Sequence, residues 1–188
     1  MVDREKVMKA VRDILCAIGE DPEREGLLET PLRIAKMYEE IFAGISNEDI
    51  EYKIFNEYSY DDMIIVKDIE FYSICEHHMV PFFGKAHIAY MPQNNKIIGI
   101  SKLARIVDVH SKKLQIQENL CRDISNSILK LANAAGVAVI IEAEHLCMAM
   151  RGIKKPGAKT ITMTFDGTLK TDAQKRMELL MYLKLSEK

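Results

Sequence analysis

The stretch that decides the fold is MIIVKDIEFYSICEHHMVPFFGKAHIAYMP, residues 63–92. Two runs in it, MIIVKDIEFYSI and GKAHIAYMP, are rich in β-branched and aromatic residues and end near proline or glycine. Runs of this kind are typical of strands. Between them lies CEHH, which holds a cysteine, a glutamate and two histidines in four positions. The sequence therefore predicts two strands with a chemically rich turn between them.

A helical part precedes these strands. Residues 3–18 carry apolar side chains at helical spacing, and a second helix opens at Thr30-Pro31. We expect Thr30 to cap that helix and Pro31 to occupy its first position. These patterns predict an N-terminal helical part over residues 1–45, followed by a second domain over residues 46–188 that contains the CEHH segment.

The elements after residue 92 complete the predicted topology. We expect Ser101 to cap a helix, and a longer helix that begins at Gln117 to stop at Gly136. Further strands are predicted at 96–100, 136–148 and 159–167, and a last helix over about 172–185. The order of helices and strands indicates an α+β fold with a mostly antiparallel sheet.

Composition excludes several classes of protein. The 188 residues include 26 basic and 28 acidic side chains, a net charge of −2, so no basic excess points to nucleic acid or a membrane surface. No apolar run approaches the ~20 residues of a membrane span, and the charged N-terminus does not resemble a signal peptide. We therefore expect a cytoplasmic protein, in which cysteines near histidines are metal ligands more readily than disulfides.

A candidate metal site combines CEHH with a distant segment. Cys75 and His78 are three positions apart, and EAEHLCMAMRG places Cys147 two residues after His145. In a strand, His145 and Cys147 would face the same cavity. Two thiolates and an imidazole suit Zn²⁺ and leave one position for water, as in catalytic sites. The alternative is a closed structural Cys2His2 site that also uses His77 or His145.

Other polar residues have both a functional and a structural interpretation. Glu118, in the first turn of a helix, stabilises the helix dipole or contacts a ligand. The cations at the predicted helix starts and after Cys147 either bind phosphate or form a solvated face. The cations are Lys102 and Arg105, Arg33 and Lys36 on the second helix, and Arg151. Ser101 is an uncharged neighbour of Lys102 at the same helix start.

Four segments together carry a resemblance to a known family. They are GEDPEREGLLETPLRIAKM, FYSICEHHMVPFFGKAHIAY, IGISKLARIVDVHSKKLQIQE and EAEHLCMAMRGIKKPGAKT. With CEHH, SKLAR, Q-x-QE and H-x-CM-x-x-RG in this order, the sequence resembles GTP cyclohydrolase I.

The resemblance implies a fold, an activity and an assembly. The fold is the tunnelling fold, an antiparallel sheet with paired helices that joins other subunits into a barrel, in a homodecamer of two pentamers. The activity is the zinc-dependent hydrolytic opening of the guanine imidazole ring of GTP. Its products are 7,8-dihydroneopterin triphosphate and formate, in the first step of folate or tetrahydrobiopterin-type pterin synthesis.

The resemblance also implies roles for individual residues. One Zn²⁺ per chain is held by Cys75, His78 and Cys147, and the acid–base residues are His77 and His145. Guanine is held by Glu118 with Gln117. The triphosphate is surrounded by Arg33, Lys36, Lys102, Arg105 and Arg151, with Ser101 nearby.

Two other functions remain open from the sequence. One is another tunnelling-fold enzyme acting on a purine or pterin, such as a deazaguanine nitrile reductase, which needs a nucleophilic cysteine and a nicotinamide cofactor. The other is a non-catalytic paralogue that binds metal.

The strands in one chain are too few to close a barrel, so we also expect identical subunits to pair the open sheet edges.

Overall fold

A five-stranded sheet forms the centre of the computed structural model, which describes residues 2–46, 54–55, 60–94 and 96–185. The strand order is β5-β2-β3-β6-β7, and all neighbours pair antiparallel except β5 and β2. The α+β class and the mostly antiparallel sheet are therefore confirmed. The strands are β2 (Ile64–Cys75), β3 (Pro81–Met91), β5 (Leu114–Gln115), β6 (Gly136–His145) and β7 (Lys159–Gly167).

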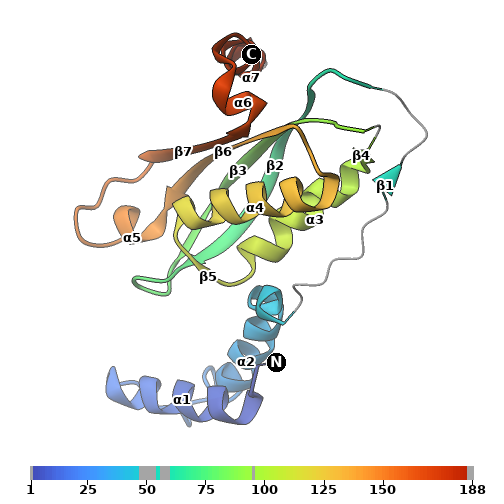
Figure 1. Ribbon diagram of the computed structural model, residues 1–188. Helices are drawn as coiled ribbons and strands as arrows, with labels where there is room; N and C mark the ends of the chain where they lie inside the picture. The colour runs from blue at the N-terminus through green and yellow to red at the C-terminus, as the bar shows by residue number, and fades with distance from the viewer. Residues whose placement is uncertain (1, 47–53, 56–59, 95, 186–188) are drawn as a thin grey trace.

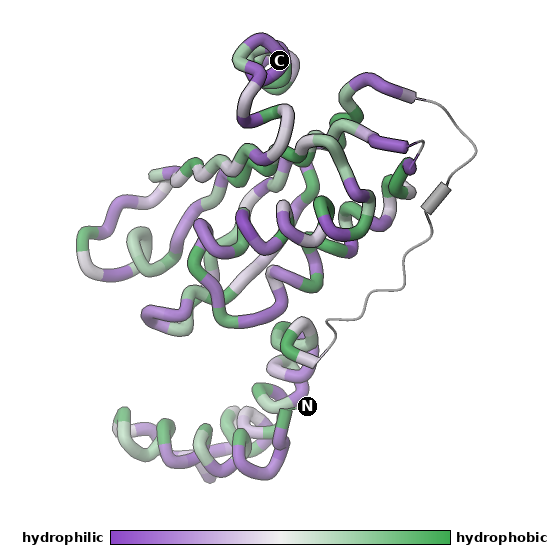
Figure 2. Tube along the Cα trace, in the orientation of Figure 1, coloured by the Kyte–Doolittle hydropathy of each residue, from purple (hydrophilic) through white to green (hydrophobic). Residues whose placement is uncertain are grey.

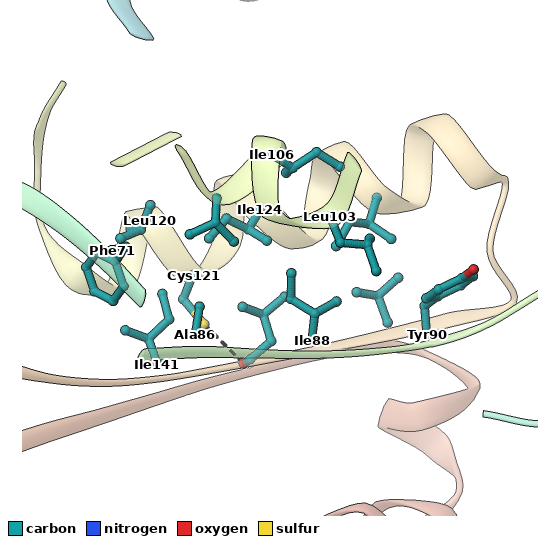
Figure 3. Close-up of a cluster of buried hydrophobic side chains, with 14 of the residues drawn as sticks. Phe71, Ala86, Ile88, Tyr90, Leu103, Ile106, Leu120, Cys121, Ile124 and Ile141 are labelled. Atoms are coloured by element: carbon teal, nitrogen blue, oxygen red, sulfur yellow. Dashed lines mark hydrogen bonds between the residues drawn. The ribbon is translucent and has the colours of Figure 1, made fainter. Parts of the chain in front are cut away.

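Two helices, α3 (Ile100–Ser111) and α4 (Gln117–Ala132), cover one face of the sheet (Figure 1). Every second side chain of a strand points to this face, so the apolar alternation of β3 and β6 builds the core. Figure 3 shows the result, in which Ile88 and Ile141 from the sheet meet Leu103 and Ile124 from the helices. Each such buried side chain contributes about 1.5–3 kcal/mol through removal of apolar surface from water.

Among the described residues, helices cover the opposite face of the sheet at one end. There α6 (Thr168–Thr171) and α7 (Ala173–Leu185) place Leu169 and Leu179 against Met91 and Ile140. The sequence predicted one helix over about 172–185, but Asp172 is extended and its carboxylate accepts hydrogen bonds from the main-chain N–H groups of the next helix. Asp172 thus separates two helices because it caps the second.

The N-terminal helices are α1 (Arg4–Ala17) and α2 (Thr30–Ile41), followed by the short helix η1 (Ala43–Ile45). In Figure 1 they lie beyond the edge of the sheet that carries β5. The Gly44 N–H donates to the Lys112 oxygen at 2.9 Å, which joins η1 to the end of α3. The division between residues 45 and 46 remains a prediction, and residues 47–53 lie outside the described part of the chain.

Several predicted boundaries were wrong for local reasons. Thr30 and Ser101 are not caps, because α2 already begins at Thr30 after Glu29, and α3 begins one residue before Ser101 after Gly99. The strand predicted at 96–100 is shorter: β4 (Ile97–Ile98) pairs with β1 (Ile54–Phe55). Helix α4 ends before Gly136, because Asn133 adopts the left-handed conformation that terminates helices.

The hydropathy colouring of the chain agrees with this layering. Apolar and polar residues alternate along α3 and α4 in Figure 2, as expected for helices with one face on the sheet. Within the described ranges, no helix has the length and apolar character needed to cross a membrane.

Candidate active site

The CEHH segment forms a closed turn at the end of β2. Cys75 donates from its main-chain N–H to the Val80 oxygen and accepts from the Met79 N–H, both at 2.9 Å. Met79 has a φ of 53°, a left-handed conformation that reverses the chain direction. The Glu76 N–H also donates to the Gln115 oxygen at 3.1 Å, which anchors the turn to β5. The turn therefore holds both histidines close to Cys75.

Strand pairing brings the second cysteine to this turn. Phe82, just after the turn, pairs with Ser73 on one side and with His145 on the other. Strand β6 ends at His145, and Leu146–Ala149 form the helical turn α5. The expectation that His145 and Cys147 lie on one strand was therefore wrong. The helical turn, rather than strand alternation, directs the Cys147 side chain.

Three side chains from these two segments form a group with the composition of a metal site. The Sγ atoms of Cys75 and Cys147 and a ring nitrogen of His78 lie within 4.8 Å of one another. Burial raises the pKa of the Cys147 thiol, and the neighbouring Cys75 raises it further. Two crowded sulfur atoms become stable thiolates when a cation lies between them, so this donor set fits a metal ion. In the described part of the chain the group has three members, which favours the open site over Cys2His2.

The remaining two histidines flank this group in different ways. His77 is exposed, and its Nδ1 lies 3.7 Å from the Cys75 sulfur. His145 is stacked on the buried ring of Phe82, with centroids 4.7 Å apart and planes at 1°. Burial lowers the pKa of His145, and the charge of Glu118 acts in the opposite direction. Both imidazoles are thus placed where they can transfer protons beside the metal group.

Gln117 and Glu118 begin α4 but differ in their surroundings. Gln117 is 1% exposed, and its amide contacts His145 and main-chain oxygens of β6 and β7. Glu118 is exposed, and its carboxylate is close enough to influence the pKa of His145. Of the two predicted guanine contacts, only Glu118 therefore has a side chain available to a ligand. The helical spacing of α4 did not predict that Gln117 is buried. No pattern in the sequence predicted that Phe82 stacks on His145.

The predicted phosphate cations at the start of α3 lie far from the metal group of the same chain. The Ile98 N–H donates to the Tyr90 hydroxyl at 3.0 Å, and Tyr90 pairs with Ile64. Helix α3 therefore begins near the first residue of β2, whereas Cys75 is its last. At the other end of α3 the Ser73 hydroxyl donates to the Ser111 oxygen at 2.7 Å, two residues before Cys75. At ~1.5 Å per helical residue and ~3.3 Å per strand residue, roughly 20–25 Å therefore separate Ser101 and Lys102 from the metal group, and Arg105 is one turn closer.

The other cations have mixed positions. Arg151 follows α5 directly, and its charge reaches the Cys147 thiol. The loop after it folds back, because the Lys155 N–H donates to the Met148 oxygen at 2.9 Å. Arg33 is exposed and forms an ion pair with Glu29 of its own chain at 2.5 Å, and Lys36 lies one turn further along α2. The single chain thus unites the metal group with His77, His145, Glu118 and Arg151, and separates it from the α3 residues.

Comparison with known proteins matches nearly the whole chain to one family. A family model described as GTP cyclohydrolase I matches residues 7–184. Proteins named GTP cyclohydrolase 1 from Thermoanaerobacter pseudethanolicus and Acetivibrio thermocellus are 58% and 54% identical over 181 residues. These alignments cover 96% of this chain and 96% and 97% of those relatives. An archaeosine synthase QueF-like structure aligns with 58% of this chain and 97% of its own, at 15% identity and a TM-score of 0.49.

Proposed function

The chain belongs to the GTP cyclohydrolase I family, and we propose that it hydrolyses GTP at the Cys75–His78–Cys147 group. The observation that carries the proposal is the convergence of this group with His77 and His145 in a chain that the family covers almost completely. The group suits one Zn²⁺ per chain, which when bound activates water for hydrolysis. The products that we assign are formate and 7,8-dihydroneopterin triphosphate, as pterin synthesis requires.

The chain's own residues divide the remaining tasks. Burial lowers the pKa of His145 and so favours its neutral form, which can accept a proton and return it to the guanine ring nitrogen. His77, on the other side of the Cys75 sulfur, is placed for a second proton transfer. Glu118 accepts hydrogen bonds from the ring N–H and amino group of guanine, a donor pair that adenine lacks. Arg151 supplies a positive charge beside the site.

The assay that tests this function measures formate and, after oxidation, a fluorescent pterin from GTP. Both should form with GTP and neither with ATP. A nitrile reductase would need a cysteine as nucleophile, and both cysteines near the site belong to the metal group. A non-catalytic paralogue would bind GTP without releasing formate, and that outcome would contradict the proposal.

The unpaired thiols of the described cysteines support our inference of a reducing, cytoplasmic location.

Replacement of Glu118 by glutamine tests recognition of guanine. The variant keeps the size of the side chain but exchanges one acceptor for a donor, which faces the donors of the base. A mismatched buried contact costs ~1–3 kcal/mol, or roughly 5–150-fold in binding or turnover, and more where a charge is involved. We expect kcat/KM for GTP to fall by roughly 5–150-fold or more, while the zinc content stays unchanged. Unaltered kinetics would reduce Glu118 to a charge that stabilises the start of α4.

We further propose that the active site is completed by a second subunit, within a homodecamer of two pentamers. The support is that the metal group and Ser101 with Lys102 lie toward opposite ends of α3 and β2 within one chain, roughly 20–25 Å apart. A cyclic arrangement could place the start of one α3 beside the metal group of a neighbour. The guanine then lies near Glu118, while Lys102 and Arg105 come from the neighbouring subunit. Arg33 and Lys36 add charge from α2.

Mixing two inactive variants tests this shared site. We expect His145→Ala and Arg105→Ala each to lose most activity, because each removes one half of every site. When the two are dissociated, mixed in equal amounts and reassembled, roughly a quarter of the sites should receive both intact halves. Activity should therefore reappear on mixing, with light scattering near the mass of ten chains. A mixture that stays inactive after proven subunit exchange would place both halves in the same chain.

A further inference from the structure

The amide of Gln117 has a defined orientation. Its nitrogen end lies 3.0 Å from the main-chain oxygen of Ile141 and 3.0 Å from that of Thr160. Carbonyl oxygens can only accept hydrogen bonds, so the group that faces them must be the NH₂. A flipped amide would instead press its oxygen against two other oxygens, in a side chain that is only 1% exposed. The orientation thus follows from the partners and does not depend on an arbitrary assignment of O and N.

This orientation decides where His145 carries its proton. The Nε2 atom of His145 lies 2.8 Å from Gln117 Oε1. An amide oxygen only accepts, so Nε2 must be the donor and carry a hydrogen. A neutral imidazole has one N–H, which leaves the lone pair of His145 on Nδ1.

A second contact holds the ring in this position. The imidazole lies parallel to the Phe82 ring, at 1° and with centroids 4.7 Å apart, and Phe82 is 0% exposed. Phe82 is also the strand partner of His145, so the backbone and the ring are fixed together. Rotation of the imidazole about its Cβ–Cγ bond by half a turn would break the bond to Gln117. The stack and the hydrogen bond thus select one orientation of one tautomer.

We propose that Gln117 is a positioning residue that restricts proton transfer by His145 to the Nδ1 atom. The proposal rests on the proposed function, because it takes His145 as a proton-transfer group. In each cycle Nδ1 accepts a proton as an O–H bond of water breaks and the water oxygen bonds to the attacked carbon of the guanine ring. Nδ1 later gives that proton to the ring nitrogen as the carbon–nitrogen bond breaks. Nε2 keeps its hydrogen throughout, and Gln117 Oε1 stabilises the imidazolium that forms in between. A buried partner that selects the tautomer of a catalytic histidine is a general device.

Nitrogen NMR of the protein with ¹⁵N-labelled histidine tests the tautomer directly, without reference to activity. The chain has five histidines, and the His145 signals are those that vanish in His145→Ala. In both zinc-loaded and zinc-free protein we expect a protonated Nε2 and an unprotonated Nδ1 for the neutral ring. A proton on Nδ1 would overturn the proposal.

Gln117→Met tests whether the tautomer matters for turnover. Methionine has nearly the same shape but offers neither the amide oxygen nor the NH₂ group. We expect His145 to populate both tautomers, kcat to fall ~10–100-fold, and KM to stay within about twofold with full zinc content. The matched control is Ser125→Ala, which removes a buried 2.7 Å bond to Asp166 between the same helix and β7. This control should lose stability but keep the Nε2–H tautomer and the normal kcat.

The possible outcomes are separable. A Gln117→Met protein with an unchanged tautomer, or with a changed tautomer and normal kcat, contradicts the positioning role. Should that variant fail to fold, the wild-type spectrum alone decides the tautomer on which the proposal depends. A fully active His145→Ala enzyme would refute the proton-transfer function of His145, whatever the spectrum shows.

Discussion

Replacement of either Cys75 or Cys147 by serine is expected to abolish both metal binding and GTP hydrolysis. Each sulfur is one of three ligand atoms that lie within 4.8 Å of one another. A serine hydroxyl is a poor ligand for Zn²⁺, because it does not ionise near neutral pH and is harder than a thiolate. Metal analysis should show about one zinc per chain in the wild type and close to none in either variant.

The matched control is Cys16→Ser, because Cys16 is an exposed cysteine on α1, remote in sequence from the metal group. It should keep both zinc and activity. The two ligand variants should largely keep their oligomeric state, because serine is close to cysteine in size and leaves the other side chains of the core cluster around Cys75 in place. Full metal content in Cys75→Ser or Cys147→Ser would refute the ligand assignment.

The second large effect is expected for His145→Ala, which should keep the metal and lose turnover. His145 lies beside the metal group but is engaged by Gln117 and Phe82, so its loss leaves the three ligand atoms in place. A positioned acid or base contributes a factor of ~10²–10⁴ to the rate. We expect kcat to fall by about this factor while zinc content stays at one per chain.

A comparison among histidines makes this prediction specific. His78→Ala should lose the metal, because His78 supplies the only imidazole of the three-ligand group in the described chain. His87→Gln is the control, because His87 lies on β3 with its side chain on the sheet face opposite α3 and α4. Its turnover should stay within about twofold of the wild type. If His145→Ala loses the metal while His78→Ala keeps it, the two roles are exchanged.

Local sequence patterns were sufficient where neighbouring residues decide the outcome. The strand predicted at 159–167 has these bounds in β7, and the strand predicted from Met63 begins one residue later in β2. Alternation of side chains is a property of consecutive residues, so it is readable without any knowledge of the partner strand. The failures at Thr30, Ser101 and Gly136 are shifts of helix ends, where several residues compete as caps.

The composition of the metal group could also be predicted from the sequence. Cys75 and His78 share one turn, and sulfur and imidazole ligands suggest a metal whatever the fold. The partner, Cys147, belongs to the group that could hold a metal, but the reason for choosing it was wrong, because α5 and not a strand carries it. Cys147 comes close to Cys75 because Phe82 pairs with Ser73 on one side and with His145 on the other. This strand register brings together two segments that are 72 positions apart in the sequence.

The sequence by itself thus determined the types of element, the apolar faces and the candidate ligands, because these depend on residue chemistry and spacing over a few positions. The tertiary structure alone decided that Gln117 is buried against His145 and that Glu118 is accessible. It alone placed Lys102 and Arg105 toward the end of β2 opposite to the metal group. The physical reason is that contacts between distant segments follow from strand register and helix packing. These are set by the cooperative burial of the whole core, and no short stretch of sequence records them.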